Sequence, residues 1–509
     1  MMIARFWERL QSLRGWRADL AGFGLGALLA AALPPLHVIP VLCLSIPGLL
    51  ALVGGARGPA SAARRGFWFG MGHHVFGLYW ITEAIMLEST RYWWLVPFAV
   101  PGLSAILAPF IAVPCAAARL ARPGWRRVAV LAGTWVLSDL ARQYIGTGFP
   151  WNPLGSVWAV PGGFGDVMIQ PAAWIGTPGL TLLTVLLAAL PALGRRWLGG
   201  SLAAVVVWAG IGWARLREPT PPPAGLDAVL VQGNMTQGQK WDRQAAQAAF
   251  LRELELTRQG VAAADGHSSV VIWPETASVY LLQYDPAARE AIMQAAQPAL
   301  GALVGGLTFR ESPFASSNLA NAPRNSLIAL QRDGSEIAAI YDKWHLVPFG
   351  EYPPSWVPFA IQIVPGHFEF GRGPATLRVP GVPAFGPLIC YEAIFPAQVI
   401  DQADRPDWMV NVTNDAWFGN STGPRQHLAA ARLRTVEEGL PLFRAANTGI
   451  SAAFDARGHE LGRIELGRAG WLTLPVPGKR GPTSFSRWGL VIPGLLSIVL
   501  VAAGIRRRR

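Results

Sequence analysis

Cys390 is the residue whose type and position could do covalent chemistry. It stands in the segment 387–392, PLICYE, where an apolar run typical of a buried strand ends in the thiol. The other two cysteines, Cys43 and Cys115, lie inside long apolar runs. A lone thiol at the carboxyl end of a strand is a candidate nucleophile, and the alternative is a small buried hydrophobic residue, which most free cysteines are.

Two further strand ends carry polar groups. The run VVIW at 270–273 leads through a proline into Glu275, and IYD at 340–342 leads into Lys343. Ligand sites of α/β sheets lie where the carboxyl ends of strands meet, so the carboxylate, the ammonium and the thiol are expected together. They would suit acyl transfer: Glu275 takes the thiol proton, Cys390 attacks a carbonyl carbon, and Lys343 stabilises the oxyanion and the thiolate.

Both charged residues also have a plainer interpretation. Glu275 could be a solvated charge at a strand end, and Lys343 could be an ordinary surface lysine. The chain holds three lysines against forty arginines, so arginine has been used nearly everywhere that positive charge suffices. A lysine at 343 therefore favours a specific need for an ammonium group.

Supporting candidates lie beside these three residues. Glu351 could pair with Lys343 or tune proton transfer, and Glu392, which follows Tyr391 after the thiol, could orient the site. Either carboxylate could equally be solvated or form a salt bridge. The histidines of this region have no metal-ligand spacing, so neither a metal nor a cofactor is expected: His345, His367 and His427.

The polar strand ends lie in a part of the chain that alternates short β-branched runs with helical patterns, which is typical of an α/β layered fold. Strands are expected at 227–232, 269–273, 302–308, 326–330, 336–340, 386–389, 408–412 and 451–454, and helices at 243–260, 286–299 and 424–439. The tetrapeptide QRDG at 331–334 predicts a hairpin between two of the strands. A proline-rich linker at 219–223 opens this part.

The rest of the chain is strongly apolar. Its 509 residues are 51% hydrophobic and 15% charged, which is typical of an integral membrane protein with a sizeable soluble part. Eight spans are expected, near 18–33, 37–54, 66–88, 92–118, 125–142, 167–191, 197–214 and 485–504, with no cleavable signal peptide before them. The expected domains are a membrane domain at 1–217, a soluble domain at 218–480, and a last span with an arginine tail at 481–509.

The distribution of charge bears on both partners and orientation. The net charge is +12, but much of the basic excess lies in short patches between apolar runs and at the two termini, which argues against nucleic acid as a partner. Arginines follow the second, fourth and sixth spans, so the N-terminus is expected in the cytoplasm. Seven crossings then place the soluble domain on the outer face, and the last span returns the C-terminus to the cytoplasm.

The motifs resemble one superfamily. Glu275 in WPE, Lys343 in YDKWHLVPFGEY and Cys390 in ICYE are similar to the Glu-Lys-Cys triad of the nitrilase, or carbon–nitrogen hydrolase, superfamily, and NVTNDAWFG at 411–419 followed by QH at 426–427 fits it too. With its spans, the whole chain resembles the bacterial apolipoprotein N-acyltransferase family, also at GFPW (148–151), VQGN (231–234) and KW (240–241). One departure is Thr236, where the family is expected to favour proline.

The resemblance implies a nitrilase-like αββα sandwich on the periplasmic side of the bacterial inner membrane and a two-step reaction without a cofactor. Cys390 takes an acyl chain from a membrane phospholipid, with phosphatidylethanolamine as the expected donor. It then passes the chain to the free α-amino group of the diacylglyceryl-cysteine of an apolipoprotein. Acyl chains hold both substrates in the bilayer, so a catalytic domain at its outer surface meets them at high local concentration.

Several aromatic residues are candidates for a lid over the lipid, and interfacial anchoring is the alternative for them: Trp151, Trp241, Trp344, Tyr352, Trp356 and Phe359. Two other classes of function stay open. A membrane-tethered amidase or nitrilase would give its acyl group to water. A transporter or scaffold with an inactive domain would need ionisable residues buried in pairs within spans, where Glu83 and Asp139 are the chief candidates.

Overall fold

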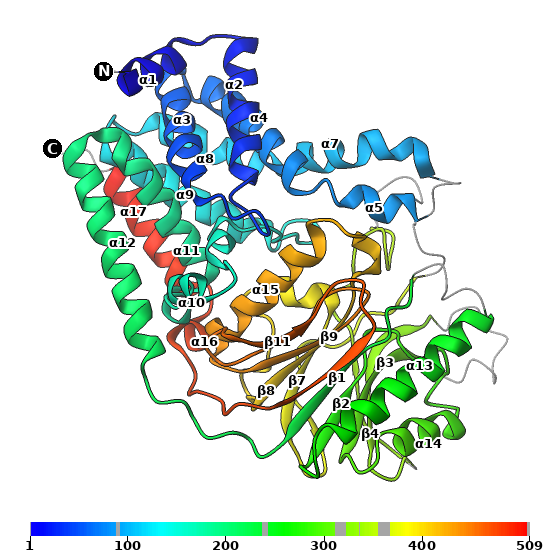
Figure 1. Cartoon of the computed structure of the whole chain (residues 1–509). Helices are drawn as coiled ribbons and strands as arrows, with labels where there is room; N and C mark the ends of the chain where they lie inside the picture. Colours follow the sequence, from blue (N-terminus) through cyan, green and yellow to red (C-terminus); the bar gives the residue numbers. More distant parts are fainter. Residues whose placement is uncertain are drawn as a thin grey trace. The chain divides into compact units, whose positions relative to one another are not determined.

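A computed structural model of the chain describes residues 2–87, 92–236, 243–310, 322–334, 336–354 and 367–505. The chain forms two compact units, one made of Met1–Glu218 with Arg487–Arg509 and the other of Pro219–Ser486 (Figure 1). Three candidate lid residues, Trp241, Trp356 and Phe359, lie outside the described residues.

The described residues of the first unit form helices joined by loops. They are α1 (Met2–Ser12), α2 (Trp16–Ala30), α3 (Leu42–Gly55), α4 (Pro59–Gly77), α5 (Ile81–Met86), α7 (Val96–Leu107), α8 (Pro109–Leu120), α9 (Trp125–Arg142), α10 (Gly163–Met168), α11 (Ala172–Ala189), α12 (Arg195–Leu216) and α17 (Val491–Ile505), with α16 (Ser484–Trp488) at the boundary between the units. Short 3-10 turns lie at Ile39–Val41, Trp93–Leu95, Leu154–Trp158 and Leu190–Leu193.

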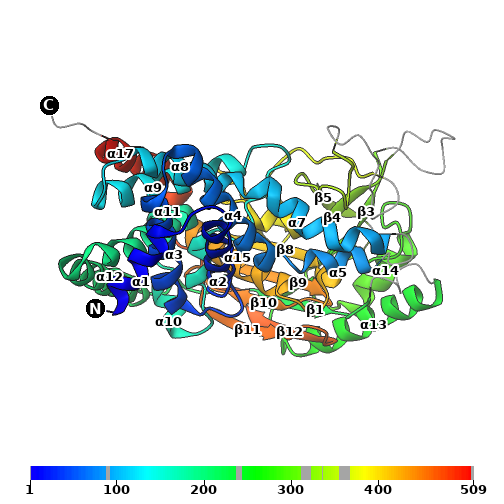
Figure 2. The same cartoon turned by 90° about the horizontal axis from the view of Figure 1, so that it is seen from above.

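Glycines allow close contact between these helices. Helix α4 packs against both α2 and α8, and α9 packs against both α8 and α17; Figure 2 shows α8, α9 and α17 side by side. A Cβ added at Gly26 of α2 would collide with the carbonyl oxygen of Phe69 on α4, and one added at Gly72 would collide with that of Phe23. In lipid there is no hydrophobic driving force for helix association, so membrane helices associate through close packing at such small residues.

Three stretches of the described residues are long and apolar enough to cross a bilayer: Trp93–Leu120, Ala172–Leu193 and Arg195–Leu216. The apolar helices at Ile39–Gly55 and Val491–Ile505 are shorter. The expected count of eight crossings is therefore not confirmed. The 15 residues of α17 rise about 22 Å at ~1.5 Å per residue, which is less than the ~30 Å of a bilayer core.

The second unit contains two six-stranded sheets. One has the order β12-β1-β2-β3-β4-β5 and the other β11-β10-β9-β8-β7-β6. The strands are β1 (Asp227–Gln232), β2 (Ser269–Ile272), β3 (Gly301–Thr308), β4 (Arg324–Gln331), β5 (Ile337–Asp342), β6 (Leu377–Val379), β7 (Val382–Ile389), β8 (Trp408–Asn414), β9 (Leu442–Asn447), β10 (Ser451–Phe454), β11 (Glu460–Ile464) and β12 (Gly470–Pro475). Strands β1, β2 and β3 run parallel, as do β7, β8 and β9, and the outer pairs are antiparallel.

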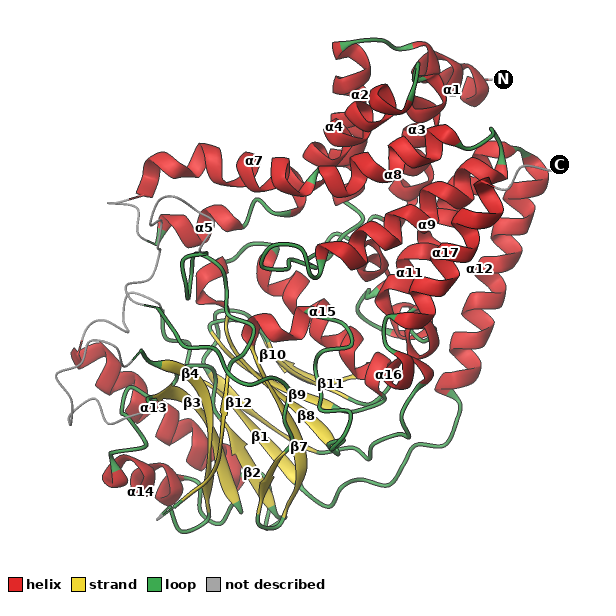
Figure 3. Cartoon of the chain, turned by 180° about the vertical axis from the view of Figure 1, so that it is seen from behind, coloured by secondary structure: helices red, strands yellow, loops and turns green. Residues whose placement is uncertain are grey.

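Helices cover the outer face of each sheet, so the unit is an αββα sandwich (Figure 3). Helices α13 (Arg243–Ala262) and α14 (Pro286–Ala295) pack on the first sheet, and α15 (Gly423–Glu438) packs on the second. Alternate residues of a strand point to opposite faces. In β1, Leu230 joins the core between the sheets, whereas Val229 and Val231 pack against the helices.

The α/β architecture expected from the sequence is confirmed in its main elements. The strand expected at 227–232 is β1, and the turn at 331–334 joins the antiparallel strands β4 and β5, with Gly334 at φ 69°. Helix α14 begins at Pro286, where the side chain of Asp285 accepts the N–H of Ala288 at 2.9 Å, a standard N-cap. It ends at Ala295, before the expected 299, because a proline follows at 298. Four strands were not expected: β6, β9, β11 and β12.

Candidate active site

The carboxylate and the ammonium meet at one edge of the first sheet. Glu275 lies shortly after β2, and Lys343 directly follows β5. The Nζ atom of Lys343 lies 3.1 Å from Oε1 of Glu275 and 2.9 Å from Oε1 of Glu351, and the lysine side chain is only 1% exposed. A buried ammonium is therefore shared between two carboxylates.

Asn325, at the start of β4, ties the two carboxylates together. Its Nδ2 donates to Oε1 of Glu275 at 2.6 Å and to Oε1 of Glu351 at 2.9 Å. The backbone carbonyl oxygen of Asn325 accepts the backbone N–H of Lys343 at 2.8 Å. Because β4 runs antiparallel to β5, the first residues of β4 lie beside the last residues of β5, and an asparagine that begins a strand reaches the site.

Glu275 also reaches the second sheet. Its Oε2 accepts the backbone N–H of Asn414, the last residue of β8, at 2.7 Å. A Cβ added at Gly305 of β3 would lie 2.7 Å from the Cα of Glu275, so only glycine lets the turn after β2 sit this close. An ionised carboxylate has about four acceptor positions, and the hydrogen bonds from Lys343, Asn325 and Asn414 leave room for one more proton donor.

Cys390 stands on a strained turn at the end of β7. Its φ of 50° lies in the left-handed region, and it opens the 3-10 turn Cys390–Ile394. Such a backbone costs a non-glycine residue about 1–3 kcal/mol, so the surrounding structure must hold it. One group that does so is Glu392, whose Oε2 accepts the N–H of Ile389 at 2.6 Å.

Glu392 also links this turn to the strand that carries the lysine. Its Oε1 accepts the Tyr341 hydroxyl at 3.0 Å and the N–H of Trp344 at 2.8 Å, and these residues lie on either side of Lys343. Burial raises the pKa of Glu392 to about 7, while the N–H groups of Ile389 and Trp344 favour its ionised form. Glu392 is thus a buried acceptor that holds the turn at Cys390, rather than a solvated charge.

The electrostatics of the site are set by burial. Burial on its own would lower the pKa of Lys343, but the charges of Glu275 and Glu351 raise it well above its usual value, and a charge on Cys390 would add to this effect. Lys343 is therefore held in its charged form. Burial and the charge of Glu275 raise the pKa of the Cys390 thiol above its usual value, against the opposing effect of Lys343. Cys390 therefore rests as a neutral thiol.

A second buried network reaches the backbone of Cys390. His427 on α15 lies with Nε2 at 2.9 Å from the carbonyl oxygen of Cys390 and Nδ1 at 3.0 Å from Oδ1 of Asp415. Arg444 on β9 lies with Nη2 at 2.7 Å from Oδ2 of Asp415, and its Nη1 donates to Asn411 at 2.5 Å. All four side chains are fully or almost fully buried. The sequence had marked His427 only as a histidine without metal-ligand spacing and as part of a family motif.

Comparison with known proteins agrees with this architecture. The family model described as the apolipoprotein N-acyltransferase N-terminal domain matches residues 25–190. The family model described as carbon-nitrogen hydrolase matches residues 228–473, which include Glu275, Lys343 and Cys390. The chain is 36% identical to the apolipoprotein N-acyltransferase of Rhodopseudomonas palustris, over 97% of this chain and 96% of that protein. The chain belongs to the apolipoprotein N-acyltransferase family. It is also 37% identical to the member from Allorhizobium ampelinum, over 92% of this chain and 91% of the relative.

The lid candidates of this N-acyltransferase family member lie in different settings. The Trp344 ring lies 3.7 Å from that of His345, between ring centroids, and packs on the core between the sheets. Tyr391, which was expected as a supporting residue rather than part of a lid, is buried with its ring 5.2 Å from that of Phe395. Tyr352 borders an open hollow of about 570 Å³ that Phe368 and Phe370 also line.

Trp151, the remaining described lid candidate, belongs to the helical unit. It is 3% exposed and lies 4.7 Å from Trp80 and 6.0 Å from Phe149, between ring centroids. In the described residues it is therefore a core member of an aromatic cluster, and the motif GFPW at 148–151 contributes to the packing of that unit.

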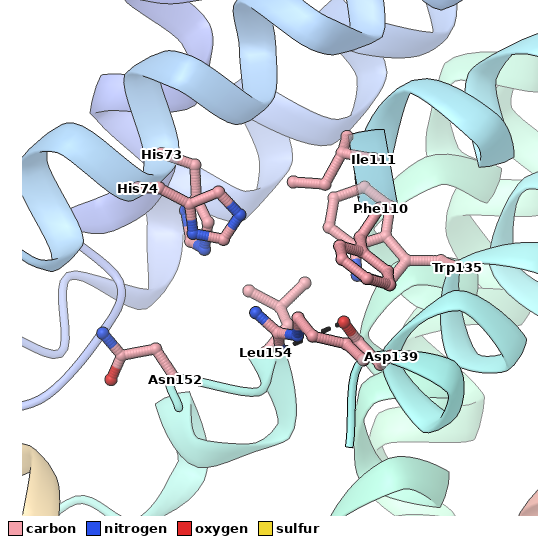
Figure 4. Close-up of a pocket in the computed structure, with 9 residues that line it drawn as sticks. His73, His74, Phe110, Ile111, Trp135, Asp139, Asn152 and Leu154 are labelled. Atoms are coloured by element: carbon pink, nitrogen blue, oxygen red, sulfur yellow. Dashed lines mark ion pairs between the residues drawn. The ribbon is translucent and has the colours of Figure 1, made fainter. Parts of the chain in front are cut away.

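The helical unit of this family member contains a small buried polar cluster (Figure 4). The imidazoles of His73 and His74 face Asp139 across a space of about 10 Å³, which is about the least that can hold one water molecule. Asp139 pairs with Arg142 at 3.1 Å, whereas Glu83 is exposed. Among the described residues, no group of three His, Cys, Asp or Glu side chains is arranged to hold a metal ion.

Proposed function

We propose that this protein transfers an acyl chain from a membrane phospholipid, through a thioester on Cys390, to the α-amino group of the N-terminal S-diacylglyceryl-cysteine of apolipoproteins. The observation that carries the proposal is the buried Lys343 shared between Glu275 and Glu351, in the unit that places Cys390 on a strained turn. Membership of the apolipoprotein N-acyltransferase family over nearly the whole chain supports the choice of substrates.

In the first step, Cys390 attacks the ester carbonyl carbon of the phospholipid. Glu275 takes the thiol proton through its remaining acceptor position as the C–S bond forms, because the raised pKa of the buried thiol makes a base necessary. The negative charge that develops on the carbonyl oxygen is stabilised by the Lys343 ammonium. The ester C–O bond then breaks, and the lysophospholipid leaves with the proton held by Glu275.

In the second step, the free amine of the apolipoprotein attacks the thioester carbonyl. Glu275 takes a proton from the amine, the C–S bond breaks, and the sulfur of Cys390 takes the proton back as the amide product forms. Cys390 is 6% exposed, which supports a site that keeps water away from the thioester. Glu351 keeps Lys343 in place throughout, since it holds Nζ from the other side.

The proposal includes a membrane organisation. Residues 1–217 and 481–509 would provide eight crossings with both termini in the cytoplasm, and residues 218–480 would form a periplasmic catalytic domain of the inner membrane. Helix α12 ends at Leu216, just before the second unit begins at Pro219, and α17 begins at Val491, just after that unit ends at Ser486. Short connections to an apolar helix at both ends support a domain held near the lipid surface.

Phosphatidylethanolamine is the proposed acyl donor and diacylglyceryl apolipoproteins are the proposed acceptors. Of the lid candidates, Tyr352 has the best support for contact with lipid, because it borders an open hollow with two phenylalanines. Trp241 and Trp356 stay candidates for the same role by their place in the chain. Replacing Tyr352 by alanine should weaken acylation by vesicle lipid, while leaving alkylation of Cys390 by a soluble reagent unchanged.

The test is intact mass spectrometry of the purified protein after incubation with phosphatidylethanolamine, beside the variant Cys390→Ala. We expect a hydroxylamine-sensitive gain of one acyl chain that is absent from the variant and is discharged by a diacylated lipopeptide with a free amine. Discharge by water as fast as by the lipopeptide would replace the proposal with a hydrolase. No adduct from any phospholipid, in folded protein, would refute the catalytic role and favour a transporter or scaffold.

A further inference from the structure

The nucleophile turn is held by side chains from two directions. Glu392 accepts the N–H of Ile389, one residue before Cys390, at 2.6 Å. On the other side, Nε2 of His427 lies 2.9 Å from the carbonyl oxygen of Cys390 itself. The left-handed φ of Cys390, 50°, lies between these two contacts. Holding that carbonyl fixes the peptide plane after the thiol, because a peptide unit is rigid and planar.

The contact requires a hydrogen on Nε2 of His427. A carbonyl oxygen only accepts hydrogen bonds, so Nε2 of His427 must carry a hydrogen. On the other ring nitrogen, Nδ1 lies 3.1 Å from Nη2 of Arg444, which always donates, and 3.0 Å from Oδ1 of Asp415. Burial and the charge of Arg444 lower the pKa of His427, and the hydrogen bond and charge of Asp415 raise it in part. In a neutral ring with its hydrogen on Nε2, Nδ1 accepts from Arg444, and in a charged ring Nδ1 donates to Asp415; both forms keep the hydrogen on Nε2.

The two charged groups beside the His427 ring, Arg444 and Asp415, neutralise each other. Arg444 and Asp415 form an ion pair at 2.7 Å, and both are fully buried. Burial opposes the ionisation of Asp415, but Arg444 and His427 lower its pKa to about 2. Thr413 donates its hydroxyl to Oδ1 of Asp415 at 3.1 Å, so this carboxylate oxygen also has a donor outside the ring.

We propose that His427 is a positioning residue for acyl transfer: its Nε2–H holds the carbonyl of Cys390 and keeps the thiol on the strained turn from which it attacks. Arg444 and Asp415 hold the ring in the orientation that makes this contact. The alternative is a core histidine whose polar atoms are merely satisfied, with no effect on the rate of the folded enzyme. The inference is tested by two measurements. The rate of acyl-enzyme formation rests on the proposed function, whereas backbone hydrogen exchange at the Cys390 turn is independent of it.

The experiment compares His427→Gln with His427→Asn in the full-length protein. The glutamine amide nitrogen reaches about as far as Nε2 of histidine, whereas asparagine is shorter by one methylene group and cannot reach the Cys390 carbonyl. We expect His427→Asn to form the acyl-enzyme about 10–100 times more slowly from phosphatidylethanolamine vesicles, with an unchanged half-saturating lipid concentration. We expect His427→Gln to stay within about fivefold of the wild type.

The second readout is hydrogen exchange of the backbone amides in 390–394. The asparagine variant should exchange these amides at least tenfold faster than the wild type, and the glutamine variant should not, because local opening is set by the contacts that hold the turn. If both variants acylate and exchange like the wild type, or if both lose rate equally in proportion to lost thermal stability, His427 has no positioning role. If the wild type forms no acyl-enzyme, the proposed function fails, and hydrogen exchange alone decides the role of His427.

Discussion

Replacing Lys343 by methionine would test how the charges of the site are balanced. Methionine keeps an unbranched side chain of similar length and removes only the ammonium. In the wild type that ammonium lies 3.1 Å from one carboxylate and 2.9 Å from the other, and both carboxylates also contact the same nitrogen of Asn325. Without it, Glu275 and Glu351 would face each other as buried like charges.

The magnitude follows from burial. Lys343 is 1% exposed, Glu275 6% and Glu351 11%, so water screens these charges little. Removing one partner of a buried ion pair costs about 3–5 kcal/mol. For a unit of this size each kcal/mol lowers the melting temperature by about 2–4 °C, so Lys343→Met should melt roughly 6–20 °C lower than the wild type.

The double variant Lys343→Met, Glu351→Gln separates stability from catalysis. It removes one of the two like charges, so it should regain more than half of the lost melting temperature in detergent solution. It should still form no acyl-enzyme, since it lacks the ammonium that we propose stabilises the oxyanion. A Lys343→Met variant that melts within about 2 °C of the wild type, or a double variant no more stable than the single one, would refute the charge balance described above.

Three further outcomes are expected. Asn325→Leu, which deletes two hydrogen bonds to carboxylates, should destabilise the protein by about 3 kcal/mol in thermal unfolding and slow acyl-enzyme formation at least tenfold; an unaffected rate would show that Asn325 does not position the charged pair. Alkylation of Cys390 by iodoacetamide should keep rising between pH 7 and about pH 10, because its pKa is raised and only the thiolate reacts, whereas a thiol with an ordinary pKa of about 8.5 would level off at about pH 9.5; a plateau reached before about pH 10 would contradict the raised pKa. Glu392→Gln should lower the rate of alkylation and the melting temperature together, because the new amide N–H₂ would face the N–H donors that Glu392 now accepts; unchanged values would show that the carboxylate does not hold the turn.

Much of the catalytic fold could be predicted because its local signals agree with its tertiary structure. The β-branched run at 227–232 is buried on both faces and forms β1, and the turn QRDG pairs β4 with β5 as expected. The polar residues that follow β2 and β5 were visible as the ends of apolar runs, and the structure brings Glu275 and Lys343 to 3.1 Å. These features depend only on short stretches of sequence.

The rest depended on partners far apart in the chain. Asn325 begins a strand, so its place beside Lys343 follows only from the antiparallel pairing of β4 and β5. Strand β9 escaped prediction because Arg444 interrupts its apolar run. The burial of that arginine depends on distant partners, among them Asn411 on β8 and Asp415 just after it. The count of eight membrane crossings stays a prediction, because apolar content does not reveal how long a helix runs before it breaks.

Because lysine is scarce in this protein, labelling of its lysines can report on opening of the catalytic unit. Of the three lysines, Lys479 is about half exposed, Lys343 is 1% exposed, and Lys240 lies outside the described residues. Amine-reactive reagents should therefore modify Lys479 quickly and spare Lys343 until the catalytic unit opens. The ratio of label on Lys343 to label on Lys479, measured by peptide mass spectrometry, would give the relative rate at which the active site opens in intact membranes.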